Sequence, residues 1–414
     1  MPEFAADEHR SPNYYVRKRL FKNKLAVFGL VLIGFATLIT LMGYWVLPDQ
    51  TPNANDGAIQ IAKKLPGFKT TLLKIRINRE IGSVGFLKKL IYGEPSPYTL
   101  VPVSDYRLEG YNVHVNVYGS SRETDYHLLE IVKPLFIGTS GKLGANIADP
   151  YVINGDQVRY LDLHENEQTT TRSELLSEFE QHNLEERRFL LGTDQSGRDL
   201  LSRLLFGTRI SFSIGFVSVL ISMFLGITMG ALAGFFRGKV DAFILWFMSV
   251  IWSIPGIMLV IAISLALNSR GVWVAFVAVG LTMWVDVARV VRGQFMSIKE
   301  KSYVEAARAF GIRNSRIIYA HILPNILGPL IVIASANFAS AILLEAGLSF
   351  LGLSVQPPTP SWGIMIFEGF KTIGTPGSWH LVVFPGLAIC LMVLSFNLLG
   401  NGLRDAFDPK TMLH

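Results

Sequence analysis

Cysteine is almost absent from this chain: Cys390 is the single one among 414 residues. One cysteine excludes an intrachain disulfide and any metal cluster built from several thiolates. Charge is also scarce, because 17% of the residues are Asp, Glu, Lys or Arg, whereas an average soluble domain carries roughly 25%. Since half of the residues are hydrophobic, the composition excludes a disordered chain and argues against an ordinary soluble enzyme.

The motifs of common catalytic chemistry are missing as well. The sequence has no G-x-x-x-x-G-K-[ST] phosphate loop, no H-E-x-x-H zinc motif, no G-x-S-x-G nucleophile elbow and no protein-kinase motif set. The histidines are scattered, including His114, His127 and His164 in a polar stretch, and a lone histidine is usually a satisfied polar residue. We therefore expect neither catalysis nor a bound cofactor or metal ion in this chain.

Six apolar runs are each long enough to cross a hydrocarbon core, which takes about 20 helical residues. The runs cover residues 25–47, 210–236, 242–267, 272–291, 322–353 and 381–403. The first run is too long for a signal peptide and contains the aromatic pair Tyr44 and Trp45, so we interpret it as a retained anchor with that pair at the far interface. Pro255, inside the third run, is compatible with a spanning helix. Glycine, serine and alanine recur along the second run and predict close helix packing.

Lysine and arginine in the short loops indicate the orientation. Six of them precede the first run and seven lie between residues 289 and 316, whereas the opposite short loops contain only Arg270 and Lys371. The net charge of +6 could indicate binding to nucleic acid or to a membrane surface. Because the basic residues lie on one side, we expect a lipid bilayer and no nucleic acid. An even number of spans then places both termini in the cytoplasm.

Residues 48–188 differ from the rest of the chain in being polar and mixed in charge. Alternating patterns predict strands over 111–117 and 157–161, and residues 175–190 have a charged helical pattern. About 140 residues can bury a core of their own. We therefore predict an extracytoplasmic α+β domain inserted between the first two spans.

The cytoplasmic loop before the fifth span contains a distinctive segment. Ser302 and Glu305 have capping-box spacing, so a helix is predicted to begin at Ser302. Gly311 is predicted to end it, and Asn314 or Ser315 to cap a second helix that runs into the fifth span. Four residues recur at helical spacing and predict one apolar face: Tyr303, Ala306, Ala307 and Phe310. Local physics leaves two interpretations open, an amphipathic helix lying on lipid and a helix that docks into a groove of a partner protein.

The motif Glu-Ala-Ala at 305–307, followed by Gly311 and by Ile-Leu-Pro at 322–324, resembles the E-A-A loop of bacterial ABC importer permeases. His321 occupies a position that is apolar in the general pattern, and permeases of the peptide class often carry this His-Ile-Leu-Pro-Asn version. The stretches 191–203, 348–363 and 401–409 also resemble the C-type subunit of dipeptide, oligopeptide and nickel permeases. The resemblance covers residues 1–47 and 189–414, and the insert at 48–188 is not part of it.

This resemblance implies an all-α polytopic inner-membrane protein with the six transmembrane helices of the ABC importer permease fold. It assigns residues 1–24 to a basic cytoplasmic N-terminus, 25–47 to transmembrane helix 1, and 189–414 to a permease core with helices 2–6 and a coupling loop at 300–324. Residues 48–188 are the inserted domain predicted above from composition and alternating patterns. The residues that the resemblance assigns to ATPase coupling are Ser302, Tyr303, Glu305, Ala306, Ala307, Phe310, Gly311, Leu323 and Pro324.

The implied function is import of peptides or similar small solutes, driven by ATP hydrolysis on partner subunits. The implied partners are a homologous second permease subunit, two ATP-binding cassette ATPases and a periplasmic solute-binding protein. The alternative is a secondary transporter or channel that acts without an ATPase and would need an ion relay of intramembrane charges. A membrane-anchored sensor is a third class, but the short cytoplasmic tails contain no output module.

A few charged or aromatic residues outside the coupling loop also stand out. Glu345, alone in an apolar run, is a candidate for the pathway or gate, with structural pairing as the alternative. Asp286 and Arg289 have the spacing of a local ion pair, and Trp362 is predicted to anchor at the interface. Asp194, Arg198, Asp199 and Arg203 are predicted to form a salt-linked turn at the membrane surface, with contact to a delivery protein or gate as the alternative.

Overall fold

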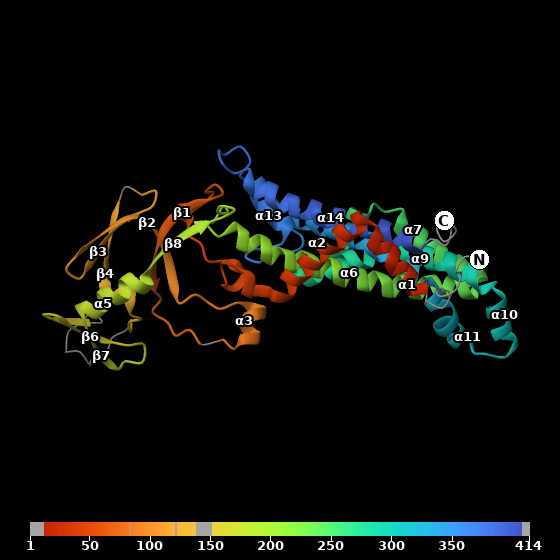
Figure 1. Cartoon of the computed structure of the whole chain (residues 1–414), viewed down its shortest axis with the longest axis horizontal. Coiled ribbons are helices and arrows are strands. Elements are labelled where there is room, and N and C mark those ends of the chain that lie inside the picture. Colours follow the sequence, from red (N-terminus) through yellow and green to blue (C-terminus); the bar gives the residue numbers. More distant parts are fainter. Residues whose placement is uncertain (1–11, 83, 121, 138–150, 408–414) are drawn as a thin grey trace, which may run out of the picture. The chain divides into compact units, whose positions relative to one another are not determined.

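The computed structural model describes residues 12–82, 84–120, 122–137 and 151–407, which belong to two compact units (Figure 1). The helical unit comprises Met1–Leu41, Gly207–Phe367 and Phe384–His414. The sheet unit comprises Met42–Phe206 and Glu368–Val383. Three long helices and one short helix are continuous from one unit into the other, and each unit is described separately below.

Long apolar helices make up the helical unit (Figure 1). In chain order they are α1 Pro12–Lys22, α2 Lys24–Met42, α6 Leu200–Phe236, α7 Gly238–Trp252, α8 Gly256–Ala266, α9 Val272–Lys299, α10 Ser302–Ala309, α11 Asn314–Arg316, the π turn η5 Ile317–Ile322, the 3₁₀ turn η6 Leu323–Ile326, α12 Leu327–Phe350, α13 Trp362–Phe370 and α14 His380–Phe407.

Five stretches in the described part of the chain are long and apolar enough to cross a membrane. They are Lys24–Val46, Leu200–Phe236, Val272–Lys299, Asn314–Phe350 and His380–Phe407. The third predicted run is not one straight helix, because α7 and α8 meet at a bend of 92°. Pro255 is the cause: it lacks an N–H and adopts an extended conformation immediately before α8. Apolar composition therefore predicts the run correctly. It does not predict the bend, which results from the backbone conformation at Pro255.

Close packing in the helical unit depends on the small residues of α6. A Cβ atom added at Gly226 would lie 2.4 Å from the Cβ of Val287, and one at Gly230 would lie 2.5 Å from the carbonyl oxygen of Ala288. Both neighbours belong to α9, so only glycine allows the two backbones to approach this closely. The predicted close packing of the second run is thus confirmed for its contact with α9.

The described part of the sheet unit contains two antiparallel sheets. The five-stranded sheet has the order β4-β3-β2-β1-β8, and the three-stranded sheet has the order β5-β6-β7. The strands are β1 Phe68–Arg76, β2 Tyr98–Glu109, β3 Asn112–Val117, β4 Glu123–His127, β5 Tyr151–Asn154, β6 Gln157–Leu161, β7 Glu167–Thr171 and β8 Leu184–Phe189. The helices and turns are η1 Gly43–Val46, η2 Pro52–Ala54, η3 Ile59–Ile61, α3 Phe86–Tyr92, α4 Leu128–Val132, α5 Arg172–Glu178 and the π turn η4 Phe179–Asn183.

The core of the sheet unit lies between the large sheet and the helices α4 and α5. Val113 and Val115, two residues apart on β3, are both fully buried, as alternation requires. Leu128 and Leu129 of α4 and Leu175 of α5 pack into the same cluster. The strands predicted at 111–117 and 157–161 are confirmed, and the described part of the insert contains both helices and strands.

The helix predicted over 175–190 is wrong in its second half. The chain is helical only as far as Asn183, and β8 then pairs antiparallel with β1 from Leu73↔Leu184 to Phe68↔Phe189. Pairing with an open sheet edge satisfies every second backbone group of β8, which outweighs the weak helical preference of its charged residues. Because that partner is more than a hundred residues away, local periodicity does not reveal it.

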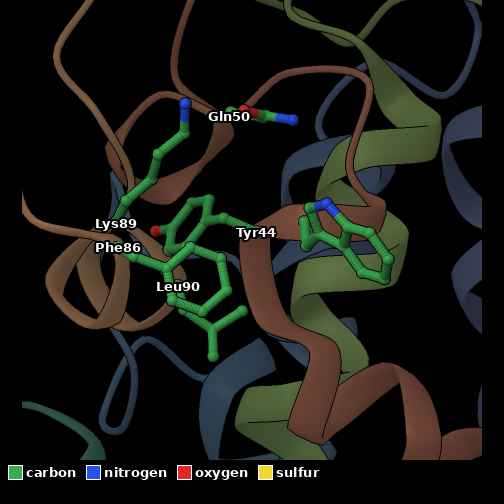
Figure 2. Close-up of a pocket in the computed structure, with 6 residues that line it drawn as sticks. Tyr44, Gln50, Phe86, Lys89 and Leu90 are labelled. Atoms are coloured by element: carbon green, nitrogen blue, oxygen red, sulfur yellow. The ribbon is translucent and has the colours of Figure 1, made fainter.

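Tyr44 and Trp45, the aromatic pair at the end of the first predicted run, differ in their exposure to solvent. The Tyr44 ring is buried and its hydroxyl accepts a hydrogen bond from the Asn53 N–H at 2.7 Å, whereas Trp45 is exposed. Figure 2 shows Tyr44 with Phe86 and Leu90 of α3 beside a cavity of about 340 Å³. The interfacial position predicted for this pair therefore suits the exposed Trp45 alone.

Candidate functional site

The predicted coupling segment forms the short helix α10. The helix begins at Ser302, as expected, but Lys301 is its N-cap and no side chain caps it. The capping box of Ser302 and Glu305 is therefore wrong, because Ser302 already has helical geometry. At the other end Gly311 has φ +74° and its N–H donates to the Arg308 carbonyl at 2.9 Å. This left-handed residue ends the helix in the way that the sequence predicts.

One face of α10 is buried and the other is exposed. Val304 and Ala307 pack into an apolar cluster with Phe295 of α9 and Ile317 of η5. Tyr303, Ala306 and Phe310 lie on the exposed side, and 86% of the Phe310 surface is accessible. The single apolar face predicted for 303, 306, 307 and 310 is therefore corrected, since Ala307 faces inward.

Ion pairs connect the neighbouring helices beneath α10. The Arg292 guanidinium contacts Asp241 of α7 through two hydrogen bonds of 2.5 and 2.7 Å. Arg237 contacts Glu300 at 2.7 Å, and the Lys299 ammonium donates to the Phe235 carbonyl. These contacts connect α6, α7 and α9 just before α10 begins.

The segment after Gly311 is an irregular helix. Arg313 precedes α11 and no side chain caps it, so the caps predicted at Asn314 and Ser315 are absent. Ile322 and Ile326 are buried, Leu323 packs against the same cluster, and Pro324 is exposed. Proline cannot donate a backbone hydrogen bond, which accounts for the change from π to 3₁₀ geometry at this point. The segment nevertheless passes directly into α12, as predicted.

Glu345 is fully buried in the helical unit. Its carboxylate accepts hydrogen bonds from Ser349 at 2.7 Å and from Ser211 of α6 at 3.2 Å. The Ser211 hydroxyl also accepts the backbone N–H of Trp362 at 3.3 Å, so α6, α12 and α13 share one polar contact. Trp362 itself is buried, and the interfacial position predicted for it is wrong.

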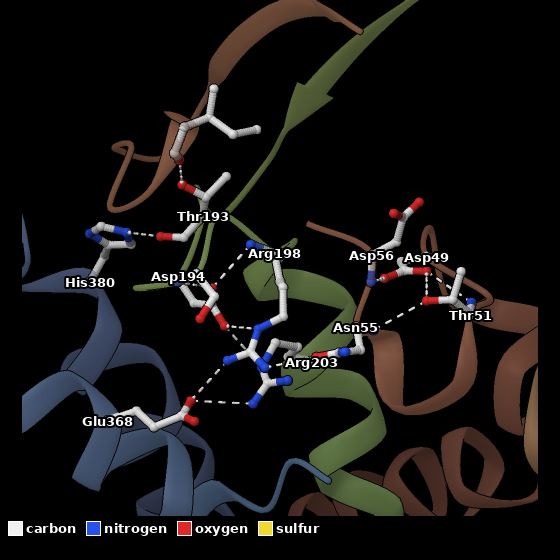
Figure 3. Close-up of polar contacts among 12 residues, drawn as sticks. Asp49, Thr51, Asn55, Asp56, Thr193, Asp194, Arg198, Arg203, Glu368 and His380 are labelled. Atoms are coloured by element: carbon white, nitrogen blue, oxygen red, sulfur yellow. Dashed lines mark hydrogen bonds and ion pairs between the residues drawn. The ribbon is translucent and has the colours of Figure 1, made fainter. Parts of the chain in front are cut away.

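Four buried charges form the central polar cluster of the sheet unit (Figure 3). Asp194 contacts Arg198 at 2.6 Å and Arg203 at 3.2 Å. Both guanidinium groups also reach one carboxylate oxygen of Glu368 at 3.3 Å. Two positive and two negative groups thus compensate one another where each alone would be costly to bury. The predicted salt links are confirmed for Asp194, Arg198 and Arg203 and are wrong for Asp199, and Glu368 was not predicted.

The same cluster extends to the segments around it. Arg198 donates to the side-chain oxygen of Asn55 at 2.9 Å, and the Thr193 carbonyl lies 3.2 Å from the His380 ring nitrogen (Figure 3). Asp199 does not join the ion pairs, because its carboxylate accepts the hydroxyl and N–H of Ser202. The polar contacts therefore hold the beginning of the insert, the start of α6 and residues 368–380 in one arrangement.

A second group of carboxyls lies beside this cluster. The N–H of Asp56 donates to Asp49 at 3.1 Å, and burial, together with the nearby charge of Asp49, raises the pKa of Asp56 from 3.8 to about 6. Burial raises the pKa of Asp199 as well. No group of three or more His, Cys, Asp or Glu residues in the described ranges is arranged to hold a metal ion.

Asp56 predicts a pH dependence of stability. Because its pKa is higher in the folded chain than in the unfolded chain, the contribution of this group is fully present below about pH 4 and is lost as the pH rises through about 6. We expect Asp56→Asn to stabilise the protein by about 1–2 kcal/mol at pH 8, after allowance for solvent screening, and not at pH 4. Unfolding of the two proteins in detergent at both pH values measures this. A variant that is no more stable than the parent at pH 8 would contradict the assignment.

Asp286 and Arg289 do not form the predicted ion pair. The Arg289 guanidinium lies over the Trp252 ring, 4.1 Å from its centre, and no ion pair joins it to Asp286 among the described residues. A cation–π contact with Trp252 is favourable for an arginine in apolar surroundings. It leaves the Asp286 carboxylate exposed on α9.

Comparison with known proteins identifies the family of this chain. Residues 226–413 match the model of the family described as binding-protein-dependent transport system inner membrane component, and residues 11–65 match the N-terminal transmembrane domain of oligopeptide transport permease C. The chain is 44% identical to the glutathione transport system permease protein GsiD of Pectobacterium atrosepticum over 53% of its own length and 72% of that protein.

Two further relatives extend the comparison. The di/tripeptide transport system permease protein DppC of Pseudomonas aeruginosa is 44% identical over 54% of this chain and 73% of its own. A structure of the MetNI methionine ABC transporter in an inward-facing conformation covers 50% of this chain and 98% of its own, at 19% identity and a TM-score of 0.43. Family members are multi-pass inner-membrane subunits, and ATP hydrolysis resides in separate subunits. This chain therefore belongs to the binding-protein-dependent inner membrane components and is a permease subunit, of the C type, of an ABC importer.

Proposed function

We propose that this permease imports short peptides or similar small solutes and receives the work of ATP hydrolysis through the exposed face of α10. The observation that carries the proposal is the two-sided α10, with Val304 anchoring one side and Tyr303 and Phe310 exposed on the other. The names of its relatives, which transport glutathione, di- and tripeptides or oligopeptides, support the substrate class.

The mechanism that we propose is alternating access. Closure of two ATPase subunits moves α10, and the contacts beneath it pass this movement to α6, α7 and α9. A partner can perform work only if it contacts the two conformations of the permease differently. The packing of Val304 and Ala307 against neighbouring helices supports this mechanism, because a loosely tethered loop would yield without moving the long helices.

The coupling element consists of residues with different roles. Tyr303, Ala306 and Phe310 would fill a groove on the ATPase, and the exposed Glu305 would add a polar contact at its edge. Ala307 would hold α10 against the helical unit, and Gly311 would set the turn after it. Ser302, Leu323 and Pro324 would position the two ends of the segment at 300–324.

Substitutions at Gly311 test whether its left-handed backbone conformation is required for coupling. Within the described residues no atom lies within 4 Å of a Cβ added here, so the constraint that the structure shows is the φ of +74°. We expect Gly311→Val to reduce ATP-driven uptake strongly, because a β-branched residue tolerates left-handed geometry poorly. Gly311→Asn is the matched control and should retain most uptake, since asparagine accepts this geometry. Equal uptake by the two variants would show that transport does not require the left-handed turn at Gly311.

We further propose the arrangement of the whole chain in the membrane. Counting the bent pair α7–α8 as one span gives six spans, with the helix at 25–47 first and helices 2–6 within 189–414. The basic residues of 1–24 and 289–316 then lie in the cytoplasm with both termini, and the inserted domain at 48–188 lies outside. A labelling reagent that cannot cross membranes should modify the insert and not α10 in intact cells.

Glu345 is proposed as part of a gate. Its hydrogen bonds with Ser211 and Ser349 join two long helices close to the start of α13. A buried carboxylate that accepts only hydroxyl donors is held less firmly than one in an ion pair. We infer that it keeps α6 and α12 together in one conformation of the permease and releases them in the other.

The test of this function is purification in mild detergent from the native host, followed by mass spectrometry of the bound proteins. The proposed partners are a homologous second permease, two ATPases with phosphate loops and a periplasmic solute-binding protein, and recovery of the first two supports the proposal. Recovery of the chain alone, with reconstituted transport that follows an ion gradient and ignores ATP, would contradict it in favour of a secondary transporter.

A further inference from the structure

The bend between α7 and α8 opens a cavity of about 310 Å³ inside the helical unit. Ile251 and Trp252, at the end of α7, and Gly256, at the start of α8, line it together with residues of α9 and α12. Interrupted helices within membranes usually occur where they line a cavity, because their free backbone groups need partners. The volume is at the lower end of the range for small-molecule sites.

Two polar side chains in this cavity have unused binding capacity. Asn337 of α12 is 94% buried, and its side-chain nitrogen has no hydrogen-bond acceptor within the described structure. Leaving a buried N–H donor unsatisfied is energetically costly, so such a group is normally explained by an absent partner. Asp286 of α9 contributes an exposed carboxylate to the same cavity, and charged groups at membrane depth often mark a substrate pathway.

The other polar groups of the cavity can also bind a ligand that has both hydrogen-bond donors and acceptors. Thr282 and Ser340 donate their hydroxyl hydrogens to backbone carbonyls of their own helices, so their oxygens remain able to accept hydrogen bonds. The start of α8 presents N–H groups and the positive end of a helix dipole. The cavity thus contains hydrogen-bond acceptors, which are the Asp286 carboxylate and the hydroxyl oxygens of Thr282 and Ser340. It also contains hydrogen-bond donors at Asn337 and Gly256.

Because a carboxylate and hydrogen-bond donors line the same cavity, we propose that it is a transient substrate subsite for short zwitterionic peptides. This proposal rests on the function given above and deepens it. The peptide ammonium group pairs with Asp286, and its carbonyl or carboxylate oxygens accept hydrogen bonds from Asn337 and the start of α8. A ligand with a single positive charge and no acceptor satisfies only half of the cavity. A purely anionic ligand is repelled by Asp286.

The test is photolabelling of the assembled transporter in detergent, without the solute-binding protein, by a dipeptide that carries benzoylphenylalanine. Labelled peptides from α8, α9 or α12 locate the site, and competition measures affinity. The competitors are alanyl-alanine and its N-acetylated form, which lacks the ammonium charge. We expect the parent protein to prefer the free amine about tenfold. Asp286→Asn should reduce this preference to less than about twofold.

Two further variants separate binding from folding. Asn337→Ala should weaken both competitors about equally and leave the preference for the free amine unchanged. Asp156→Asn, which removes an exposed carboxyl of the sheet unit, should behave like the parent. Labelling that is absent or lies outside the cavity, or an Asp286→Asn variant that keeps the tenfold preference, would overturn the subsite. The proposed function fails separately, if the parent transporter shows no ATP-driven uptake.

Discussion

Phe310→Asp is expected to reduce ATP-driven uptake by about thirtyfold without unfolding the permease. The Phe310 side chain is 86% exposed, so its replacement removes no internal packing. An aromatic residue that fills a partner's groove commonly contributes about 2 kcal/mol or more to binding, which corresponds to roughly a thirtyfold loss of affinity. Placing a carboxylate in the groove adds a desolvation cost. Uptake into proteoliposomes and ATPase recovery during purification measure the two consequences.

Two controls distinguish docking from damage to the fold. Ile137→Asp makes the same kind of change at another exposed apolar residue, 77% accessible in the sheet unit, and should leave uptake unchanged. Val304→Asp places a charge inside the cluster beneath α10 and should lower the stability of the permease itself. Normal uptake by Phe310→Asp would show that the exposed face of α10 does not carry the coupling.

Arg203→Met is expected to lower the free energy of unfolding by about 3–5 kcal/mol, because it removes one partner from a buried charge cluster. Arg203 is fully buried and contacts both Asp194 and Glu368. Its loss leaves two carboxylates with the single guanidinium of Arg198. Chemical denaturation of the purified protein in detergent measures the change.

The matched control is Arg159→Met, which breaks an exposed ion pair with Glu167 and should change stability by less than about 1 kcal/mol. Arg203→Lys should fall between the two, since an ammonium group keeps the charge but lacks the fork that reaches both carboxylates. An Arg203→Met variant as stable as Arg159→Met would mean that the cluster contributes specificity and not stability.

Local chemistry allowed parts of both units to be predicted. The left-handed Gly311 and the small residues of α6 follow from glycine's lack of a Cβ atom, which acts within a turn or at one helix contact. The strand at 112–117 follows from alternation of its own residues. In each case the property that determines the structure belongs to a few neighbouring residues.

Features that depend on distant partners escaped prediction. Glu368 completes the cluster around Arg203 although 165 residues separate them, and β8 is a strand only because β1 offers an open edge. Ala307 and Phe310 looked equivalent by helical spacing, but Phe295 and Ile317 cover the one and leave the other exposed. The cavity with Asp286 and Asn337 needed the bend at Pro255, whose size no periodicity specifies.

The most direct test of ATPase coupling places benzoylphenylalanine at residue 310 in the native membrane and irradiates it. The account predicts a covalent product with an ATP-binding subunit from residue 310. The same photoreactive residue at 137, in the insert, should form none, because that domain is proposed to lie on the opposite side of the membrane. Failure of residue 310 to reach an ATPase, or crosslinking of residue 137 to one, would contradict the proposed role of α10.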